Sequence, residues 1–463
     1  MPSEREPARE LIGRVASAFT ELRHDHTLSE VDGPLGWPGY GEQLTRAADL
    51  TGESESVVCG LARIGDVTAV VVAFEFGFLG GSLGTRTGAR IEQAFTHARE
   101  LRVPVVSLVA TGGSRMQEGT LALMQLPRIA RQITLTREAG LPHISVLRDP
   151  TTGGGWATLG AGADVVLGLH GAQVGFAGSR VRPPGYSVTQ QFAAGLVDQL
   201  VEPDELRARL ERWLHLLTTP GNGPAPVPPA LGATTLPETG WEAVRRARAP
   251  ERPRAGQYLA AYFDWLEPVS GDRSGGVDPG VLCGFGHRDG RTIAYAAQDG
   301  TATRPAGFRT AARLVRLADR LGIPVLTLVD TPGAANDEAA ENAGVGAAIA
   351  DMFTAVAAAR VPVTTLLIGE GGSGGALAFA APGRTWATPD SYLAVISPEL
   401  AAAILKRDPA QEKETADRLR LRPQDLAELG IAQLGPSADQ ATAMYRNASS
   451  ELGTQMVTRP TTP

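Results

Sequence analysis

The sequence of this chain predicts an α/β fold in which one structural unit occurs twice. Three observations support this prediction. The chain matches itself at an offset of 220 residues, apolar strands alternate with helices in each copy, and a glycine-rich turn recurs where a buried strand leads into a helix. With 463 residues, of which 43% are hydrophobic, the chain can bury two cores of ordinary size.

The internal repeat carries most of this argument. At the 220-residue offset, Pro104 falls on Pro324 and Gly113 falls on Gly333, and the register continues without a gap as far as Ile396. Apolar strands often match one another by chance, but prolines, glycines and strands do not readily stay in step over about 75 residues. We therefore expect the two halves to share one fold.

Each half is expected to contain the same order of elements. A strand of alternating apolar residues leads through glycines into a helix, a buried strand follows, and then come a glycine-rich turn, a long helix, a second buried strand and a second glycine-rich turn. The first strand, first helix, long helix and second buried strand are predicted at 67–76, 90–101, 118–140 and 143–149 in the first half, and at 291–298, 308–321, 341–360 and 363–369 in the second.

Composition indicates where the domains begin and end. Residues 218–238 are rich in Pro, Gly and Thr and show neither a strand nor a helix period, which is typical of an interdomain linker. We therefore expect an N-terminal extension over residues 1–29, a first domain over 30–217, a second domain over 239–450 and a C-terminal tail over 451–463.

Charge and composition argue against several classes of protein. A net charge of −7 disfavours nucleic acid as a partner, because such binding rests on a clustered basic surface. Cys59 and Cys283 are too few for a zinc ribbon or a disulfide framework, so we expect no bound metal and a reducing, cytoplasmic location. No apolar run approaches the ~18 residues that cross a bilayer, so no membrane association is expected. Lysine occurs only as Lys406 and Lys413, which leaves no Walker or Schiff-base lysine elsewhere.

The glycine-rich turn at 369–377 satisfies two known patterns. Its glycine spacing matches the dinucleotide-binding fingerprint, but the equivalent turn at 151–154 lacks that fingerprint. The same turn matches the nucleophile elbow of α/β-hydrolases around Ser373, where a catalytic histidine must follow the serine in the chain. No histidine follows His287, so both patterns are weak indications.

With both patterns weak, the interpretation that remains for the glycine-rich turns is a function of their backbone. Where a strand ends in glycines at the start of a helix, unpaired N–H groups and the positive end of the helix dipole meet a ligand that no Cβ obstructs. Such a turn can act as an oxyanion hole, in which each donor contributes roughly 3–4 kcal/mol in a dry site. The alternative is that the glycines only permit close packing of helix and strand. The presence of the turn in both halves favours anion binding.

Longer motifs surround these turns. In the first half they are GPLGWPGY (33–40), FGFLGGSLGTRTGARI (76–91), TGGSRMQEG (111–119), AGLPHISVLRDPTTGG (139–154) and GAQVGFAGSRV (171–181). In the second half they are WEAVRRARAPERPRAGQYLAAYFD (241–264), DTPGA (330–334), GEGGSGGALA (369–378) and SYLAVISPELAAAILKRD (391–408). At these residues the sequence resembles the carboxyltransferase of bacterial acetyl-CoA carboxylase, of the crotonase superfamily, with its β and α subunits fused in one chain. The resemblance covers roughly residues 30–215 and 240–435.

This resemblance implies two crotonase-like domains of repeated ββα units, a β-type domain on the acyl-CoA side and an α-type domain on the biotin side. The implied reaction moves a carboxyl group from carboxybiotin to the α-carbon of a short acyl-CoA, with acetyl-CoA giving malonyl-CoA for fatty acid biosynthesis by default. Gly153 and Gly154 would hold the thioester oxygen as it becomes an enolate, and Gly374 and Gly375 would hold the ureido oxygen of biotin. The ureido nitrogen would remove the α-proton, so no side-chain base is implied.

Further residues are placed at the substrate by the same resemblance. Arg115 is a candidate for direct substrate contact, although a packing and helix-capping role with Glu118 is equally consistent with its position. Arg304 and Arg309 are candidates for contacts with CoA phosphates, or solvated arginines. The glycines of the matching turns complete the substrate-binding set: Gly80, Gly81, Gly112, Gly113 and Gly333.

The resemblance also implies partners, and the chain differs from the family pattern at several points. The chain has no Met-Lys-Met biotinylation site, so we expect biotin to arrive on a separate carrier protein that a biotin carboxylase charges, and we expect a homodimer or a higher homo-oligomer. The zinc ribbon of many relatives is missing, and the segment at 299–307 and the tail of the first half, after the Arg-Pro-Pro-Gly run at 182–185, are shortened. A biotin-independent decarboxylase or a specialised acyl-thioester carboxyltransferase of secondary metabolism is the alternative enzyme, and a non-catalytic scaffold is a third hypothesis.

Overall fold

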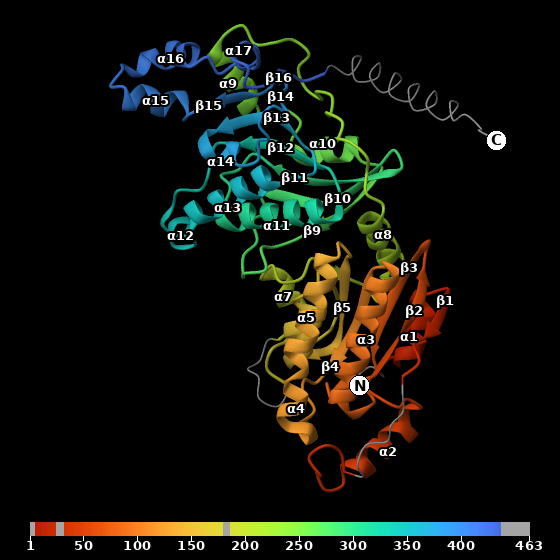
Figure 1. The fold of residues 1–463 in the computed structure, drawn as a ribbon. Coiled ribbons are helices and arrows are strands. Elements are labelled where there is room, and N and C mark those ends of the chain that lie inside the picture. Colours follow the sequence, from red (N-terminus) through yellow and green to blue (C-terminus); the bar gives the residue numbers. More distant parts are fainter. Residues whose placement is uncertain (1–4, 25–31, 179–185, 437–463) are drawn as a thin grey trace, which may run out of the picture. The chain divides into compact units, whose positions relative to one another are not determined.

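The computed structural model describes residues 5–24, 32–178 and 186–436 (Figure 1). The expected tail at 451–463 therefore lies outside the described residues. The chain divides into two compact units: Met1–Pro220 with Glu267–Val277, and Gly221–Leu266 with Asp278–Pro463. Each unit is built around one sheet that carries helices, so the predicted α/β class is confirmed.

The first unit contains a mixed sheet in the order β1-β2-β3-β4-β5-β6-β8, with β7 paired to β5. The pairs β1–β2 and β2–β3 are antiparallel and the pairs from β3 onward are parallel. The strands are β1 Ala18–Glu21, β2 Val57–Ile64, β3 Val67–Phe74, β4 Val105–Thr111, β5 His143–Thr152, β6 Val165–Leu169, β7 Val174–Gly175 and β8 Gln199–Val201.

The helices of the first unit include α3 and α5, which pack together beside the sheet (Figure 1). The described helices are α1 Ala8–Val15, α2 Tyr40–Thr51, η1 Leu79–Gly81, α3 Thr85–Leu101, η2 Met116–Glu118, α4 Gly119–Leu123, α5 Gln125–Glu138, α6 Gly153–Gly155, η3 Trp156–Gly160, α7 Val188–Ala193 and α8 Leu206–Thr218.

The second unit repeats this plan with a sheet in the order β16-β14-β13-β12-β11-β10-β9, in which β15 pairs with β13. Its strands are β9 Trp265–Val269, β10 Val281–Arg288, β11 Arg291–Gln298, β12 Val325–Thr331, β13 Val363–Gly372, β14 Thr385–Ala387, β15 Tyr392–Ala394 and β16 Gln433–Leu434. Its helices are α9 Gly240–Arg248, α10 Ala255–Tyr262, α11 Pro305–Leu321, α12 Glu338–Asn342, α13 Val345–Ala358, α14 Ser373–Leu377, α15 Pro398–Ile404, η4 Pro409–Gln411, α16 Glu412–Arg418 and α17 Pro423–Glu428.

The internal repeat holds at the level of irregular backbone features. The pairs α3 and α11, β4 and β12, and β5 and β13 all lie at the 220-residue offset. The β4–β5 and β12–β13 ladders each shift register between equivalent residues. An isolated bridge joins Leu83 to Ser114, and its equivalent joins Thr303 to Ala334. Bulges and isolated bridges are local features of specific chain paths, so this agreement shows that the two units share one detailed fold.

The connection between the first parallel strand and the first helix differs between the units. Strands β3 and β11 are offset by 224 residues, whereas α3 and α11 are offset by 220, so the β11–α11 connection is four residues shorter than its counterpart. This difference matches the shortened segment that the sequence showed near residue 300.

Helix boundaries differ from the sequence predictions for identifiable reasons. The predicted helix at 308–321 begins at Pro305, because a proline at the first helical position has a suitable φ and needs no N–H partner. The predicted helix at 118–140 is broken into α4 and α5, since Pro127 is tolerated only in the first turn of a helix. The predicted helix at 341–360 starts at Val345, after a left-handed residue at Gly344.

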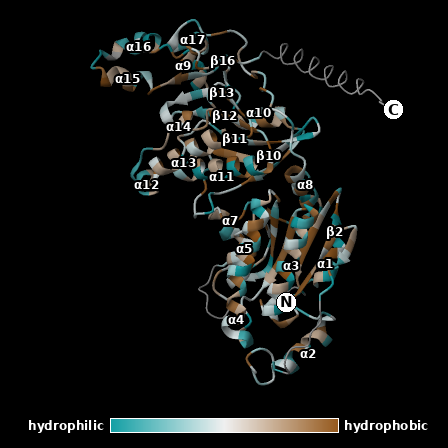
Figure 2. Ribbon diagram, viewed as in Figure 1, coloured by the Kyte–Doolittle hydropathy of each residue, from teal (hydrophilic) through white to brown (hydrophobic). Residues whose placement is uncertain are grey.

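Each unit has its own apolar core. In the first unit, Phe74 and Val109 of the sheet pack with Ile91, Phe95 and Ile129 of α3 and α5. Figure 2 shows β2 and its neighbours as mainly hydrophobic strands and the helices with mixed faces. No helix among the described residues is long and apolar enough to cross a membrane.

Candidate active site

The first glycine-rich turn lies where β5 ends at Thr152 and α6 begins at Gly153. Gly153 has a φ of +60°, and a Cβ on it would lie 3.1 Å from the Cα of Gly113, so the two backbones touch. The Gly153 N–H donates to the carbonyl oxygen of Phe176 at 3.0 Å and is therefore used within the unit. At the start of a helix the next N–H groups have no intrahelical acceptor, so within the predicted pair it is Gly154 whose N–H lacks a partner in its own helix.

The repeat adds a residue that the sequence analysis did not single out. At the 220-residue offset, Gly154 and Gly155 fall on Gly374 and Gly375, whereas Gly153 falls on Ser373. Gly153 and Ser373 both have a left-handed backbone, with φ values of +60° and +56°. The positions equivalent to Gly374 and Gly375 are therefore Gly154 and Gly155.

Two neighbouring segments close around the first turn. The Gly112 N–H donates to the Gly80 carbonyl oxygen at 2.9 Å, and a Cβ on Gly81 would collide with the carbonyl oxygen of Ala110. The Gly113 N–H donates to the Thr111 hydroxyl at 3.1 Å. The structure thus brings the predicted residues Gly80, Gly81, Gly112 and Gly113 together with Gly153, through close backbone contacts that side chains would prevent.

The second turn has the same construction. The Gly333 N–H donates to the Thr331 hydroxyl at 3.1 Å, as Gly113 does to Thr111 in the first unit. A Cβ on Gly375 would lie 2.8 Å from the carbonyl carbon of Gly333, whereas a Cβ on Gly374 would meet no atom within 4 Å. The predicted residues Gly333, Gly374 and Gly375 therefore meet at one turn that has open space beside Gly374.

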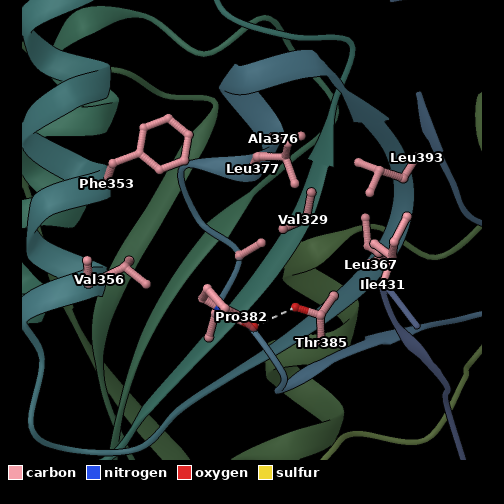
Figure 3. A pocket seen from close by; sticks show the side chains of 13 residues that line it. Val329, Phe353, Val356, Leu367, Ala376, Leu377, Pro382, Thr385, Leu393 and Ile431 are labelled. Atoms are coloured by element: carbon pink, nitrogen blue, oxygen red, sulfur yellow. Dashed lines mark hydrogen bonds between the residues drawn. The ribbon is translucent and has the colours of Figure 1, made fainter. Parts of the chain in front are cut away.

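An apolar cavity of about 290 Å³ lies next to this second turn (Figure 3). Ala376 and Leu377, which directly follow Gly375, line it together with Val329 and Leu367 of the sheet and Phe353 of α13. This volume is close to the ~300 Å³ at which small-molecule pockets begin. The cavity is therefore large enough to receive part of a ligand held at the turn.

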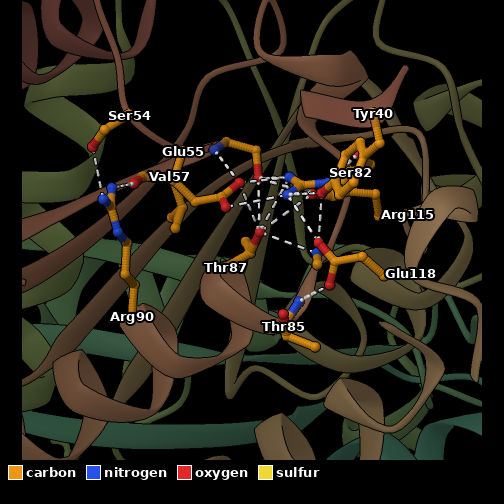
Figure 4. Close-up of polar contacts among 12 residues, drawn as sticks. Tyr40, Ser54, Glu55, Val57, Ser82, Thr85, Thr87, Arg90, Arg115 and Glu118 are labelled. Atoms are coloured by element: carbon orange, nitrogen blue, oxygen red, sulfur yellow. Dashed lines mark hydrogen bonds and ion pairs between the residues drawn. The ribbon is translucent and has the colours of Figure 1, made fainter. Parts of the chain in front are cut away.

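Arg115 is the centre of a buried polar cluster beside the first turn (Figure 4). Its guanidinium contacts Glu55, at 2.5 Å and 3.1 Å, and donates to the Ser82 carbonyl oxygen at 2.8 Å. The side chains of Arg115 and Glu55 are 1% and 0% exposed. We call the set the Arg115 cluster; its members are Tyr40, Glu55, Ser56, Ser82, Thr87, Arg115 and Glu118.

The electrostatics of the Arg115 cluster indicate a charged pair. Burial alone would lower the pKa of Arg115, but the charge and hydrogen bonds of Glu55 raise it above its usual value. Burial alone would raise the pKa of Glu55, and Arg115 brings it below its usual value. Because every guanidinium nitrogen of Arg115 already has partners within the cluster, the geometry favours the packing role over direct contact with substrate.

Glu118 does bind a helix N-terminus, although not that of its own helix. One of its carboxylate oxygens accepts from the Thr85 N–H at the start of α3 at 2.6 Å, and the other accepts from the Tyr40 hydroxyl at 2.6 Å. The Arg115 cluster thereby ties α3 to the loop after β4.

The second unit holds its turn with a different buried charge, which the sequence analysis missed. Asp330, at the end of β12, is fully buried and pairs with Arg252 at 2.6 Å and Arg254 at 3.0 Å. Its carboxylate also accepts from the Glu370 N–H at 3.1 Å, at the strand end that leads into the second turn. The run of arginines in 241–264 and the motif DTPGA were the available signals, but their pairing required the fold.

Arg304 and Arg309 lie on the surface near the short β11–α11 connection. Arg304 makes a two-pronged ion pair with Asp337, at 2.9 Å and 3.0 Å, and its side chain is 43% exposed. Arg309 donates to the Ala343 carbonyl oxygen at 3.1 Å. Contact of either residue with CoA phosphates stays a prediction.

Cys59, Cys283 and His143 are all buried, and burial shifts their pKa values. Burial raises the pKa of Cys59 and of Cys283 to about 12 each. His143 is buried and hydrogen-bonded to Ser107 at 2.8 Å, and burial lowers its pKa to about 4. Within residues 5–24, 32–178 and 186–436, no group of three or more His, Cys, Asp or Glu side chains could hold a metal ion.

Two family models match the chain, one for each unit. The model of acetyl co-enzyme A carboxylase carboxyltransferase-like proteins matches residues 237–434, and that of the carboxyl transferase domain matches residues 40–183. The acetyl-coenzyme A carboxylase carboxyl transferase subunits beta/alpha of Salinispora arenicola (strain CNS-205) are 40% identical over 439 residues, which cover 87% of this chain and 77% of that protein. The chain belongs to the acetyl-CoA carboxylase carboxyltransferase family. It is therefore an enzyme of the transferase class.

A second relative supports the family assignment, and a solved structure supports the fold. A probable biotin-dependent acyl-coenzyme A carboxylase beta3 subunit of Mycobacterium tuberculosis (strain CDC 1551 / Oshkosh) is 33% identical over 416 residues, which cover 86% of this chain and 83% of that protein. The solved transcarboxylase 12S, a hexamer with methylmalonyl-coenzyme A and methylmalonic acid bound, matches with a TM-score of 0.77 and 20% identity over 99% of this chain and 91% of that chain. This structural match confirms the crotonase-like fold.

Proposed function

We propose that this carboxyltransferase moves a carboxyl group from carboxybiotin, on a separate carrier protein, to the α-carbon of a short acyl-CoA. Acetyl-CoA, which gives malonyl-CoA, is the default substrate. The observation that carries the proposal is the pair of equivalent turns, one in each unit, at which a buried strand ends in glycines and a helix begins. The relatives' names support it, because they describe acetyl-CoA carboxylase and biotin-dependent acyl-CoA carboxylase components.

The first turn is proposed to stabilise the enolate of the acyl-CoA. The N–H of Gly154, helped by that of Gly155, donates to the thioester oxygen at the positive end of the helix dipole. Gly153 contributes its left-handed backbone, which turns the strand into the helix, rather than its own N–H. The Arg115 cluster is proposed to position this turn, because it ties α3 to the loop that carries Gly113.

The second turn is proposed to bind the ureido oxygen of biotin. Gly374 and Gly375 stand at the second and third positions of α14, where N–H groups have no intrahelical acceptor, and the space beside Gly374 is open. Carboxybiotin bound there would supply CO₂ and, once CO₂ has left it, a ureido nitrogen able to take the α-proton, so that the enolate carbon can then join CO₂. The chain then needs only to hold two oxygens that gain negative charge, which agrees with the neutral, structural environment of His143.

The experiment that tests this proposal runs the reaction in reverse. The purified chain is incubated with malonyl-CoA, with and without biocytin, and acetyl-CoA is measured. Release of acetyl-CoA that requires biocytin supports the carboxyltransferase. No reaction of malonyl-CoA or methylmalonyl-CoA under either condition would contradict it.

A second candidate is a biotin-independent decarboxylase of a malonyl-type thioester. The observation that favours it is the short β11–α11 connection, whose residue Thr303 lies against the loop after β12 that carries Gly333. In the same assay this enzyme would release acetyl-CoA at an equal rate without biocytin.

We also propose that the chain acts as a homo-oligomer, with a biotin carboxyl carrier protein and a biotin carboxylase as partners. Support comes from the solved transcarboxylase 12S, which assembles as a hexamer. Light scattering after size exclusion should give a mass of at least twice 48.4 kDa, and a mass of one chain would contradict this proposal.

A further inference from the structure

The cavity beside the second turn has a filled counterpart in the first unit. Ala376 lines the cavity immediately after Gly375 (Figure 3). The repeat places Trp156 at the position of Ala376, immediately after Gly155. The same place in the fold therefore carries a methyl group in one unit and an indole in the other.

The surroundings of Trp156 correspond to the cavity wall. Leu367 and Ala380 line the cavity, and their repeat equivalents are Leu147 and Gly160. A Cβ on Gly160 would lie 2.6 Å from the Trp156 ring atom Cε3 and 3.2 Å from Leu147 Cδ2, so the indole packs between these residues. Trp156 is 8% exposed and belongs to a buried apolar cluster that includes Leu147.

The side chains around the cavity are also more exposed in the second unit than their equivalent in the first unit. Phe353 and Leu377 line the open cavity and are 42% and 41% exposed, whereas Ile133, the equivalent of Phe353, is 5% exposed. The backbone changes too, because Trp156 begins a π-helical turn in which its carbonyl oxygen accepts from the Ala161 N–H at 2.7 Å. Such turns are rare and occur often at functional sites.

We propose that Trp156 is a specificity-determining residue that restricts the acyl group at the first turn to a short chain. The inference rests on the proposed function, which places the thioester oxygen at Gly154. An acyl chain that continues from a carbon held there would enter the space beside the start of the helix. In the second unit that space amounts to about 290 Å³, more than the ~150 Å³ of an apolar cavity that binds benzene. In the first unit the indole fills it.

The test measures the binding of acetyl-CoA and hexanoyl-CoA, in the absence of biotin, by titration calorimetry. The wild-type chain should bind hexanoyl-CoA no more tightly than acetyl-CoA. Trp156→Leu and Trp156→Ala should tighten the binding of hexanoyl-CoA at least about tenfold relative to acetyl-CoA, because each buried CH₂ is worth about fourfold in affinity. Trp156→Phe should give a smaller gain. Trp213→Leu, which removes another buried tryptophan of the first unit, is the matched control and should leave the ratio unchanged.

Each outcome bears on a separate claim. Thermal melts show which variants are folded, and Trp156→Phe retains most of the packing volume if the smaller side chains unfold the unit. An unchanged ratio of hexanoyl-CoA to acetyl-CoA affinity in a folded Trp156 variant would overturn the assignment of Trp156 and leave the proposed function standing. Failure of the wild-type chain to bind either thioester would overturn the proposed function, and the specificity assignment with it.

Discussion

The two units use one backbone plan and different side chains to support it. Both place a glycine-rich turn after a buried strand, with an equivalent shift of register and an equivalent isolated bridge. In the first unit the turn is held by the Arg115 cluster and the adjoining pocket is filled by Trp156; in the second the turn is held by Asp330 and the pocket is open. The shared part is backbone geometry, as the proposed function expects, because that proposal assigns the common chemistry to N–H groups and leaves the side chains to adapt each unit to its own ligand.

The largest expected effect comes from side chains placed on the two turns. Gly154→Val and Gly375→Val should each lower carboxyltransferase activity by at least ~10²-fold, since loss of one oxyanion donor costs about that much. A Cβ on Gly375 would press on Gly333, and one on Gly154 would press on Leu126. The malonyl-CoA and biocytin assay measures the loss. Gly256→Ala in α10 is the control, because its Cβ meets no atom within 4 Å and the residue lies outside both turns, so it should cost far less; equal losses in all three variants would contradict this account.

Breaking either buried charge network should destabilise its own unit. Arg115→Met leaves Glu55 buried without its partner, and Asp330→Asn does the same to Arg252, so each should lower the free energy of unfolding by about 3–5 kcal/mol. Urea denaturation followed by circular dichroism gives the value. The double variant Arg115→Met/Glu55→Gln should recover part of the loss. A single variant of full stability would show that the network is dispensable.

A smaller difference between the units should appear as a pH dependence. His143 stands in the first unit where Val363 stands in the second. Burial lowers its pKa from 6.5 to about 4, so between these pH values the unfolded chain binds a proton that the folded chain excludes. Stability should therefore fall as the pH drops from 6.5 to 4, with a slope of up to ~1.4 kcal/mol per pH unit from this residue.

The control for this pH effect is His143→Gln, which retains a polar group next to Ser107. The variant should show a flatter dependence of the urea midpoint on pH between 4 and 6.5 than the wild-type chain does. Identical slopes for the two proteins would show that His143 titrates normally in the folded state.

The smallest effect is expected at the surface of the second unit. Arg304→Ala removes an exposed ion pair with Asp337 and should leave the melting temperature unchanged. If Arg304 meets a CoA phosphate, the variant should bind acetyl-CoA a few-fold more weakly and bind acetyl-pantetheine as the wild type does. Equal affinity of variant and wild type for acetyl-CoA would remove Arg304 from the site.

The sequence predicted the repeat and the turns well because both depend on local signals. Glycines and prolines mark the chain path directly, so the strand at 291–298 and the turns at 151–154 and 369–377 were recognisable without a structure. The sequence alone could not decide the role of Arg115, since Glu55, the residue that pairs with it, lies 60 positions earlier. The pairing of Asp330 with Arg252 was missed for the same reason.

Two further features needed the fold. The Gly153 N–H differs from that of Gly154 only because the Phe176 carbonyl reaches it from a distant loop. The segment Glu267–Val277 groups with the first unit, where buried Glu267 accepts from Gln199 at 2.9 Å and pairs with Arg209 at 2.8 Å. No composition signal marks such a long-range pair.

The central claim, that the first turn serves the acyl thioester and the second serves biotin, is tested most directly by equilibrium binding of acetyl-CoA to the two valine variants. The account predicts that Gly375→Val retains wild-type affinity for acetyl-CoA and loses biocytin-dependent release of acetyl-CoA from malonyl-CoA, while Gly154→Val loses acetyl-CoA affinity. Loss of acetyl-CoA binding in Gly375→Val, with binding retained in Gly154→Val, would contradict the account and reverse the assignment of the two turns.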